Sequence, residues 1–451
     1  MMVESEQNQV VPKGYKLTEV GILPTDWDCK SLGDLGDVVR GGSPRPAGDP
    51  KFFNGSFIPW LTVASLTNIP KSKMHVTDTA TYLTELGSKQ SRTLQPDTLI
   101  ISNSGATLGV AKILGIKCCA NDGIAAIINQ KLGHKPFLVH YINTQTQQLH
   151  DSVATGNGQP NLNTELIRNI QVPFPPLEEQ TAIANALSDV DVLISELEKL
   201  IAKKQAIKTA TMQQLLTGKK RLPEFAKNED GTKKGYKKSE LGDIPEDWQS
   251  LSLGSDAVLK ARIGWQALTT KEYQVSGDFF LVTGTDFDAG LVKWERCFHV
   301  SEWRYKQDTN IQLKEGDVLV TKDGTIGKVG YVPKLTKPAT LNSGVFVIRP
   351  KRESFEPRFL FYILTSRLFD DFITRITAGS TITHLYQKDF VNFEFFAPEK
   401  SEQIAIATIL SDMDSDIQAL EQRLSKTRQI KQGMMQELLT GKTRLVKPES
   451  K

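Results

Sequence analysis

The sequence has few of the residues from which metal and redox sites are built. Its 451 residues include four cysteines and six histidines, and none stands in a CxxC, HExxH or mixed Cys/His ligand spacing. The adjacent Cys118 and Cys119 cannot readily bridge each other. We therefore expect reduced, partly buried thiols and no metal site.

Long apolar runs and a strong charge excess are also missing. No run of about 18 apolar residues occurs, and the first twelve residues are polar and acidic, unlike a secretory signal. The formal net charge is only +3, too small for a protein that coats nucleic acid indiscriminately. These absences predict a cytoplasmic protein without a membrane partner, and charge alone does not indicate DNA binding.

Catalytic motifs are lacking too, since no P-loop, Ser-His-Asp spacing or nucleophile elbow is found. Asp317 and Lys322 faintly resemble a nuclease core, but the second acidic residue beside the lysine is absent. The glycines within 324–330 do not form GxGxxG, and 174–177 lacks the leading Asn and aromatic end of an adenine methyltransferase motif. The chain is predicted to be non-catalytic.

What the sequence does contain is one internal repeat. A lead-in motif recurs at an offset of about 221 residues, and a helix motif recurs about 223 residues on. The lead-in comprises Gly14, Tyr15, Lys16, Glu19, Gly21, Pro24, Asp26 and Trp27, matched by Gly235, Tyr236, Lys237, Glu240, Gly242, Pro245, Asp247 and Trp248. The helix motif comprises Glu179, Gln180, 187–189 and 215–219, matched by Glu402, Gln403, 410–412 and 438–442. The predicted order is domain, helix, domain, helix.

Two long helices carry the clearest periodicity, within 171–222 and 395–445. Each follows a proline and ends near a glycine, Pro175 and Gly218 or Pro398 and Gly441. Apolar residues step by four and three along a coiled-coil seam: Ile183, Leu187, Val190, Ile194, Leu197 and Ile201, then Ile406, Leu410, Met413, Ile417, Leu420 and Leu424. Such helices are too long to be stable alone, so they should pack on each other, antiparallel if the halves are related by a pseudo-twofold axis. The alternative is two unrelated amphipathic helices, each packed on its own domain.

The remaining segments read as two globular domains, 14–170 and 235–394, with a linker at 223–234 and tails at 1–13 and 446–451. Candidate strands are 98–102, 124–128, 279–283, 317–321 and 344–348, and candidate helices are 136–152 and 357–377. Scattered matches link the domains, such as Asn121 with Asn342, Gly123 with Gly344 and Leu162 with Leu385. The predicted fold class is α+β, with two mixed α/β domains separated by two long antiparallel coiled-coil helices.

Two polar loops in each domain are candidates for DNA contact. Their amides and hydroxyls can bond base edges and phosphates, and their cations suit phosphate or guanine. The first domain offers Arg40, Ser43, Arg45, Asn157, Gln159, Asn161 and Asn163. The second offers Lys260, Arg262, Trp265, Gln266, Ser380, Thr381, Thr383, His384 and Tyr386. For each of these residues a solvated surface loop is the competing interpretation.

The lead-ins, the Glu-Gln-x-x-Ile-Ala-x-x-Leu-Ser helix starts and the Leu-Leu-Thr-Gly-Lys ends resemble the specificity (S) subunits of type I restriction-modification systems, the HsdS family. The segment from Gly316 to Gly327 is similar to a recurrent part of that family's target-recognition domains. The resemblance adds three DNA-contact candidates there, Lys322, Asp323 and Thr325, with Asn103 and Ser104 at the less similar place in the first domain.

The resemblance also implies a function. Each domain would read one half of a bipartite, asymmetric DNA site, while the helix pair sets the gap and docks two DNA methyltransferase subunits. Restriction subunits would join this complex, and S-adenosylmethionine, magnesium and ATP would be bound by the partners. An adaptor with a coiled coil and two protein- or ligand-binding domains is the alternative.

Overall fold

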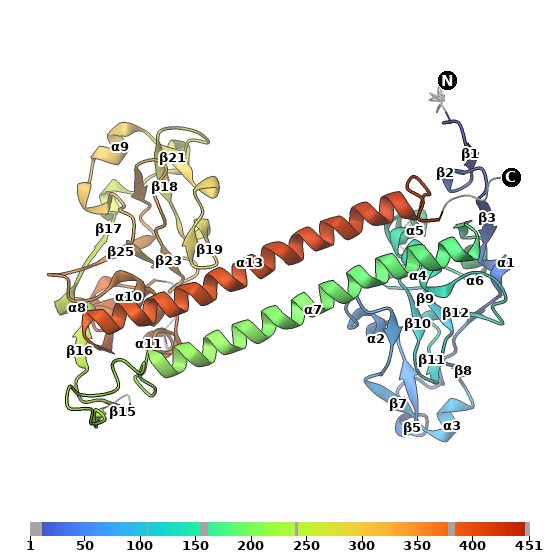
Figure 1. The fold of residues 1–451 in the computed structure, drawn as a ribbon, viewed down its shortest axis with the longest axis horizontal. Helices are drawn as coiled ribbons and strands as arrows, with labels where there is room; N and C mark the ends of the chain where they lie inside the picture. The colour runs from blue at the N-terminus through green and yellow to red at the C-terminus, as the bar shows by residue number, and fades with distance from the viewer. Residues whose placement is uncertain (1–10, 106, 154–160, 240–241, 378–383, 447–451) are drawn as a thin grey trace. The chain divides into compact units, whose positions relative to one another are not determined.

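A computed structural model describes residues 11–105, 107–153, 161–239, 242–377 and 384–446. The chain divides into two compact units. Unit 1 comprises residues 1–200 and 420–451, and unit 2 comprises residues 201–419. Each unit therefore contains one globular domain and part of each of two long helices, α7 and α13 (Figure 1).

Unit 1 contains the elements β1 to β13 and α1 to α6. Its strands are β1 Tyr15–Thr18, β2 Gly21–Pro24, β3 Asp28–Ser31, β4 Asp37–Arg40, β5 Phe53–Leu61, β6 His75–Val76, β7 Thr81–Leu83, β8 Arg92–Leu94, β9 Leu99–Ser102, β10 Ala111–Leu114, β11 Cys118–Ala120, β12 Ile124–Ile128 and β13 Gln171–Phe174. Its short helices are α1 Leu32–Leu35, α2 Val63–Thr67, α3 Glu85–Ser88, α4 Lys135–Thr144, α5 Thr146–Val153 and α6 Thr164–Arg168.

Unit 2 contains β14 to β26, α8 to α12 and five 3₁₀ turns among its described residues. Its strands are β14 Tyr236–Ser239, β15 Gly242–Pro245, β16 Gln249–Ser252, β17 Ala257–Ala261, β18 Phe279–Val282, β19 Phe287–Asp288, β20 Leu291–Val292, β21 Phe298–Val300, β22 Val318–Thr321, β23 Val329–Tyr331, β24 Ala339–Leu341, β25 Val345–Pro350 and β26 Glu394–Ala397. Its helices are α8 Leu253–Asp256, α9 Glu302–Lys306, α10 Pro357–Leu364, α11 Arg367–Thr377 and α12 Gln387–Phe390, and its turns are η1 Gly264–Gln266, η2 Thr270–Glu272, η3 Gly284–Asp286, η4 Trp294–Arg296 and η5 Thr309–Ile311.

Five strands of the main sheet follow the same order in both units, and unit 2 adds a sixth, β19, at the edge. The sheet runs β4-β12-β9-β10-β6 in unit 1 and β17-β25-β22-β23-β20-β19 in unit 2. The first three pairings are antiparallel and the fourth is parallel in both sheets. A second sheet also corresponds, because β5 lies parallel to β11 and β18 lies parallel to β24. The repeat therefore extends through the globular domains, where sequence similarity is thin.

The candidate strands are present, each within two residues of its predicted ends. The candidate helices differ, because 136–152 is divided into α4 and α5, and 357–377 into α10 and α11. At the second break the hydroxyl of Ser366 donates to Ile363 O at 2.6 Å and accepts from Leu368 N at 3.3 Å. These local bonds compete with the helical pattern and divide the helix.

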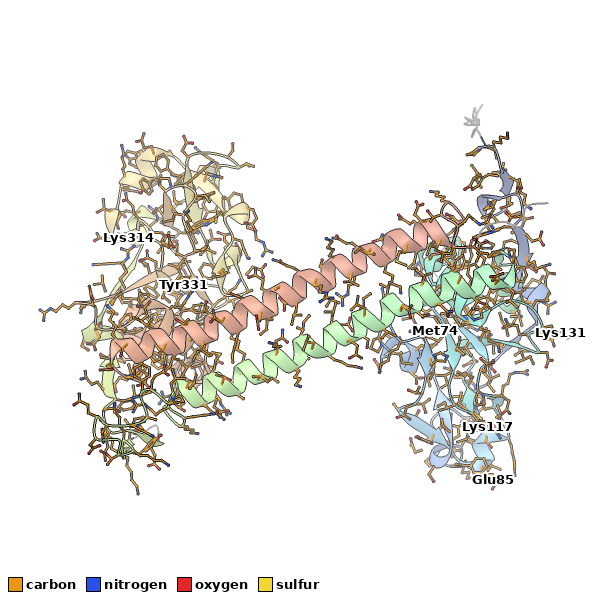
Figure 2. The ribbon with its side chains drawn as sticks, viewed as in Figure 1. Met74, Glu85, Lys117, Lys131, Lys314 and Tyr331 are labelled. Carbon is orange, nitrogen blue, oxygen red and sulfur yellow. The ribbon has the colours of Figure 1, made fainter. Side chains whose placement is uncertain are left out.

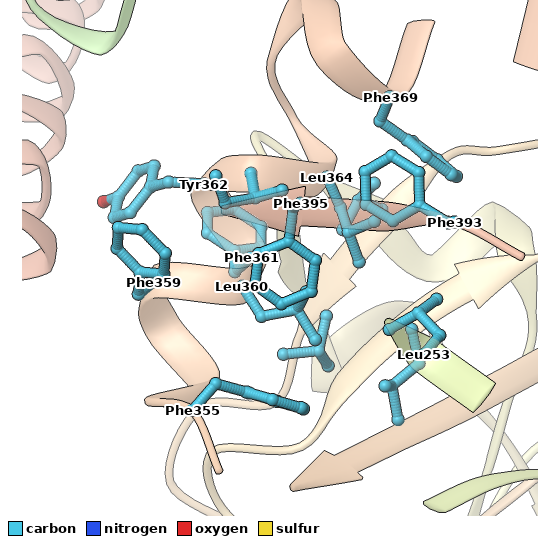
Figure 3. Packing of buried hydrophobic residues seen from close by; sticks show 14 of the residues in the cluster. Leu253, Phe355, Phe359, Leu360, Phe361, Tyr362, Leu364, Phe369, Phe393 and Phe395 are labelled. Atoms are coloured by element: carbon cyan, nitrogen blue, oxygen red, sulfur yellow. The ribbon is translucent and has the colours of Figure 1, made fainter. Parts of the chain in front are cut away.

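The core of unit 2 is rich in phenylalanine (Figure 3). Its fully buried rings include Phe355, Phe359, Phe369, Phe390 and Phe395. Tyr362 lies at the edge of this cluster with its hydroxyl directed away from the other rings (Figure 3). The core of unit 1 instead consists mainly of aliphatic side chains around Trp27 and Phe137. The two cores thus fill similar sheets with side chains of different size.

Two features outside the cores bear on the sequence predictions. All four cysteines are unpaired, and burial raises the pKa of the Cys118 thiol to about 12. No helix among the described residues combines the length and the apolar character that crossing a bilayer requires.

The long helices are α7, Leu177–Leu215, and α13, Lys400–Leu438, each of 39 residues. In unit 1, Lys431 Nζ lies 2.7 Å from Asp191 Oδ1, and Arg428 Nη2 lies 2.7 Å from Glu198 Oε1. From the first ion pair to the second, the residue number rises along α7, from 191 to 198, and falls along α13, from 431 to 428. These helix segments therefore lie side by side in opposite directions.

The same arrangement is found within unit 2. Lys204 Nζ lies 2.9 Å from Asp416 Oδ2, and Lys208 Nζ lies 2.5 Å from Asp414 Oδ1. Here too the numbering rises on one helix and falls on the other. Within each unit, therefore, the helix segments are antiparallel and joined by lysine or arginine ion pairs.

The predicted seam side chains all lie away from solvent. Nine are buried, and the other three, Val190, Met413 and Leu420, are half-buried. The first two seam positions of each helix also belong to a domain core, Ile183 and Leu187 in unit 1 and Ile406 and Leu410 in unit 2. The beginning of each helix therefore packs on its own domain as well as on the end of the other helix.

Each lead-in motif binds the end of a long helix. In unit 1, Arg444 forms hydrogen bonds of 2.6 to 2.9 Å with Glu179 and Asp26. The indole Nε1 of Trp27 donates to Glu179 at 3.0 Å, and the hydroxyl of Tyr15 donates to Gly441 O at 3.2 Å. Gly441 has a φ of 68°, as a left-handed helix end requires.

Unit 2 contains the matching arginine and tyrosine bonds. Arg221 bonds Glu402 and Asp247 at 2.5 to 3.1 Å, and the hydroxyl of Tyr236 donates to Gly218 O at 3.1 Å. Gly218 has a φ of 69°. The lead-in and the helix end recur together in the sequence because they contact each other in the fold.

Candidate nucleic-acid interface

A hydroxyl side chain shapes the same hairpin in both domains. Ser102 Oγ, at the end of β9, accepts from Val110 N at 3.1 Å and donates to Thr107 O. Thr321 Oγ1, at the end of β22, accepts from Lys328 N at 2.9 Å and donates to the carbonyl oxygen of Thr325. The two hairpins therefore have one construction, and the residues after Ser102 correspond to those after Thr321.

The second of the two candidate loops, which contains Asn161 in unit 1 and His384 in unit 2, contacts this hairpin in each domain. In unit 1, Ser104 forms an isolated β-bridge with Asn161, and Leu162 N donates to Asn103 O at 2.8 Å. In unit 2 the bridge joins Asp323 to His384, and Leu385 N donates to Lys322 O at 2.8 Å. Segments about 60 residues apart in sequence thus present neighbouring side chains.

In the first domain the early loop, which contains Arg40, Ser43 and Arg45, joins the same face through Asp122. Ser43 Oγ donates to Asp122 Oδ1 at 2.7 Å, and Arg40 Nε donates to Asp122 O at 2.6 Å. Asn103 Nδ2 also donates to that carbonyl, at 3.2 Å. Arg45 reaches the carboxylate at 3.8 Å while its side chain stays 73% exposed. Four predicted contact residues therefore converge on one turn.

The corresponding face of the second domain presents other chemistry. His384 Nδ1 lies 2.5 Å from Asp323 Oδ1, and the imidazole lies 5.3 Å from the half-exposed ring of Tyr386. Lys388 Nζ lies 5.5 Å from the centre of the Tyr386 ring. The hairpin turn adds the exposed Thr325. This surface combines a lysine, an imidazole–carboxylate pair and an aromatic ring, whereas the first domain combines arginines and a carboxylate with amide and hydroxyl groups.

The family model of the type I restriction modification DNA specificity domain matches residues 24–209 and 245–431. The chain belongs to this family. The two matches fall on the two repeated halves, so each half contains one specificity domain with its helix. This supports the specificity-subunit interpretation over the coiled-coil adaptor.

Known relatives extend along almost the whole chain. The type I restriction enzyme MjaVIII specificity subunit of Methanocaldococcus jannaschii is 27% identical over 431 residues, covering 94% of both chains. The putative MjaX specificity subunit of the same organism is 26% identical over 444 residues, covering 96% of this chain and 97% of the relative.

Two solved structures share the fold. The type I restriction-modification S subunit from M. genitalium aligns with a TM-score of 0.58 at 14% identity, covering 91% of this chain and 96% of that one. A chain from a study of type I R-M complex assembly and conformational transition aligns with a TM-score of 0.52 at 16% identity, covering 93% and 99%.

A cationic depression of about 530 Å³ adjoins the early loop of this specificity-family chain. Arg40, Lys89 and Arg92 line it together with the backbone of Gly41. Arg92 Nε donates to Arg40 O at 2.8 Å, which holds the two strand ends together. A Cβ at Gly41 would lie 2.0 Å from Asn121 O, so only glycine permits this close approach. The exposed cations suit phosphate oxygens.

Several predicted contact residues support the loops from inside. Arg262 is only 2% exposed, and its Nε donates to Leu341 O at 2.9 Å. Burial, and the nearby Arg304, lower its pKa. Asn103 and Gln266 are also buried, at 1% and 6% exposure. In this structure these three side chains shape the surface and do not form it.

Other predicted residues have varied positions. Asn163 caps α6, accepting from Leu166 N at 2.8 Å, and Lys260 is exposed on β17. Lys322 Nζ lies 5.5 Å from the centre of the Phe346 ring. The side chain of Trp265 lies outside the description, and so do these residues: Asn157, Gln159, Ser380, Thr381 and Thr383.

Sequence reasoning missed Asp122, Lys89, Arg92 and Lys388 as parts of these surfaces. The Asn-Asp-Gly sequence at 121–123 is a turn signal that could have drawn attention to Asp122. Lys89 and Arg92 lie about 50 residues from Arg40, and no local pattern links them to it. Among the described residues no group of three or more His, Cys, Asp or Glu could hold a metal ion.

Proposed function

We propose that this chain is the DNA sequence-specificity subunit of a type I restriction-modification complex, and that each domain reads one half of a bipartite, asymmetric site. One observation carries the bipartite interpretation. The same hydrogen-bonded scaffold presents different side chains in the two domains, with Ser104 and Asn161 replaced in order by Asp323 and His384. A common scaffold with different donors and acceptors is what two unlike half-sites require.

The exposed groups fit direct readout of bases. Asparagine pairs well with adenine, a carboxylate accepts from the cytosine amino group, and lysine donates to guanine. Asn161 is exposed in the first domain, and the Asp323–His384 pair and Tyr386 are accessible in the second. The cations of the depression, Lys89 and Arg92, would position the sugar-phosphate backbone of the DNA.

We infer that α7 and α13 form one antiparallel coiled coil that sets the gap between the half-sites. The opposed ion pairs within each unit and the buried seam support this. Leu193, Leu200 and Ile207 on α7 are 39%, 40% and 45% exposed at seven-residue spacing, an apolar stripe that a methyltransferase subunit would cover.

In the complete complex two methyltransferase subunits and the restriction subunits would supply the chemistry. S-adenosylmethionine, magnesium and ATP would be held by those partners. A chromosomal DNA target would place the complex in the cytoplasm. This chain contributes recognition and spacing.

Exchanging residues 235–394 for the equivalent domain of another family member should change one half of the methylated site and leave the other half and the gap unchanged. The reason is that the contacts described for the first domain's loops, such as those of Arg40 and Ser43 with Asp122, join them to other residues of the same domain. Single-molecule sequencing of genomic DNA from cells that also express the methyltransferase subunit would read both halves. Changes in both halves would contradict independent reading.

Replacing both Lys89 and Arg92 with glutamine should weaken DNA binding of the methyltransferase complex about equally for target and non-target sequences. Each lost phosphate contact should reduce the slope of log affinity against log salt by about 1. Fluorescence anisotropy over a salt series measures both. Lys131→Gln is the matched control, because this exposed lysine follows the opposite end of β12 from the 121–123 turn. Equal slopes for the double variant and the control would exclude the depression as a phosphate site.

A further inference from the structure

Unit 1 contains a cavity of about 310 Å³ that the recognition function does not use. It lies between the domain and one turn of each long helix, and Met74 on its wall is labelled in Figure 2. Its apolar walls are Leu66, Ile69, Met74, Val139 and Met435. The volume is at the lower end of small-molecule sites, enough for a compound of about one ring.

Charged groups face the same cavity. Lys112 is 3% exposed, and its Nζ donates to Pro70 O at 3.1 Å and to Lys73 O. An ammonium has three donors, so one remains. Asp191 forms its ion pair with Lys431 at 2.7 Å. Burial lowers the pKa of Lys112 to about 8, opposed by the nearby Asp191. With Lys71, which also lines the cavity, three ammonium groups and one carboxylate leave the cavity with an excess of positive charge.

The equivalent place in unit 2 contains larger side chains, Tyr362 and Phe287. Gln180 Oε1 accepts from His134 N at 2.8 Å, as Gln403 Oε1 accepts from Glu356 N at 2.8 Å, so α4 and α10 start in register. Six residues further, His140 therefore corresponds to Tyr362.

The Tyr362 hydroxyl donates to Asp414 at 2.8 Å, and Asp414 also pairs with Lys208. The side chain of His140 is too short to form the corresponding bond to Asp191. Its imidazole lies 3.4 Å from Ser188 Oγ instead. Burial lowers the pKa of His140 to about 3, so the ring is neutral at pH 7.

The main sheets of the two units also differ at the position of Lys112. Lys112 pairs with Ile100 in β9, and Gly330 pairs with Leu319 at the corresponding position of β22. A Cβ at Gly330 would lie 2.9 Å from the Phe287 ring, so that ring covers the glycine. An aromatic ring in unit 2 thus occupies the side of the sheet that a lysine occupies in unit 1.

We propose that the unit 1 cavity binds a small organic anion, with its carboxylate or phosphate against Lys112 and its apolar body between Met74 and Met435. The uncompensated buried ammonium selects the charge, and the thioether walls accept a flat apolar group. The ligand would contact β10 and α4 of the domain together with α7 and α13. Its binding would therefore stabilise the packing of the domain on these helix segments.

Methyl NMR of the full-length chain labelled with ¹³C-methyl methionine tests this, with sodium benzoate as the probe. Benzoate should cause saturable shifts of the Met74 and Met435 methyl signals and leave those of Met212 and Met413 in unit 2 unchanged. Benzamide, which has the same shape without the charge, should bind at least tenfold more weakly. No saturable shift, or equal binding of benzamide, would overturn the proposal.

Two variants make the test specific. His140→Tyr should abolish the shifts, because the phenol reproduces the packing of Tyr362 beside Asp191. Lys112→Met should weaken benzoate binding at least tenfold. Tyr362→His in unit 2 is the matched control and should leave binding at Met74 unchanged. Undiminished shifts in folded His140→Tyr protein would show that benzoate binds elsewhere. The His140→Tyr test remains valid even if the Lys112→Met variant fails to fold.

Discussion

A half-length chain of residues 1–222 should form a symmetric dimer that directs methylation to a palindromic DNA site. Leu215 and Leu216 at the end of α7 occupy the same position in the repeat as Leu438 and Leu439 at the end of α13. Both pairs are buried beside the start of the other long helix, in the core of unit 2 and the core of unit 1 respectively. Two copies of the first half can therefore replace the contacts between the halves.

The arginine networks at the helix ends also allow a second copy of the first half to replace the second half. Arg221 bonds Glu402 and Asp247 in unit 2, as Arg444 bonds Glu179 and Asp26 in unit 1. In the dimer Arg221 of one copy would bond Glu179 and Asp26 of its twin. Both domains would then be the first one, so both half-sites would be alike and inverted.

Sedimentation of the fragment tests dimer formation, and methylation mapping with the methyltransferase subunit tests the site. Arg221→Met in the fragment is the informative control, since it should shift the equilibrium toward monomer. A monomeric fragment, or a methylated site that is not palindromic, would contradict the pseudo-twofold relation.

Arg444→Met should destabilise unit 1 by about 3 to 5 kcal/mol, because it leaves a buried carboxylate without its partner. Glu179 is 1% exposed, and the Arg444 side chain is 19% exposed. The methionine retains much of the apolar stem, so lost charge and not lost volume causes the effect. Chemical denaturation of the full chain measures the free energy of unfolding of unit 1.

The effect of Arg444→Met on the stability of unit 1 should depend on pH in a defined direction. The hydrogen bond from Arg444 holds the pKa of Asp26 below its ordinary value of 3.8. Such a carboxylate stabilises the fold above its unfolded pKa and loses this contribution as the pH falls through the folded pKa. The difference between wild type and variant should therefore shrink below about pH 4.

Arg221→Met is the matched variant, because Glu402 is 0% exposed in the equivalent network of unit 2. It should lower the stability of unit 2 and leave unit 1 unchanged. Adding Glu179→Gln to Arg444→Met should restore part of the lost stability, since the amide carries no buried charge. A loss below 1 kcal/mol for both arginine variants would show that the networks contribute no more than surface ion pairs.

Much of the architecture could be predicted from local patterns. The four-three spacing of apolar residues indicated both long helices, and glycine placed their ends correctly because Gly218 and Gly441 adopt a positive φ that other residues avoid. The candidate strands were found because β-branched and aromatic runs fit a buried sheet. The division of 357–377 into α10 and α11 was missed, because it depends on side-chain hydroxyls bonding the backbone.

The contact surfaces were only partly predictable. Polar loops indicated Arg40, Ser43 and Asn161, which the structure brings to one candidate face, but the same reasoning placed Arg262 on the surface, where the structure has it buried against Leu341. In the sequence, an arginine near glycines gives the same pattern whether its side chain is exposed to solvent or bonds a buried carbonyl. Lys89 and Arg92 were not identified, because Arg40 and Arg92 lie on strands of two different sheets, which meet only in the folded domain.

The sequence by itself determined the repeat, the presence and ends of the long helices and the family, since each depends on residues within a few turns or on direct similarity. Only the tertiary structure decided that Asp122 joins the early loop to the hairpin, that the helix ends bond the lead-in motifs, and that a cavity remains beside Lys112. These features depend on residues tens to hundreds of positions apart. Their proximity follows from sheet pairing and core packing, which no local pattern encodes.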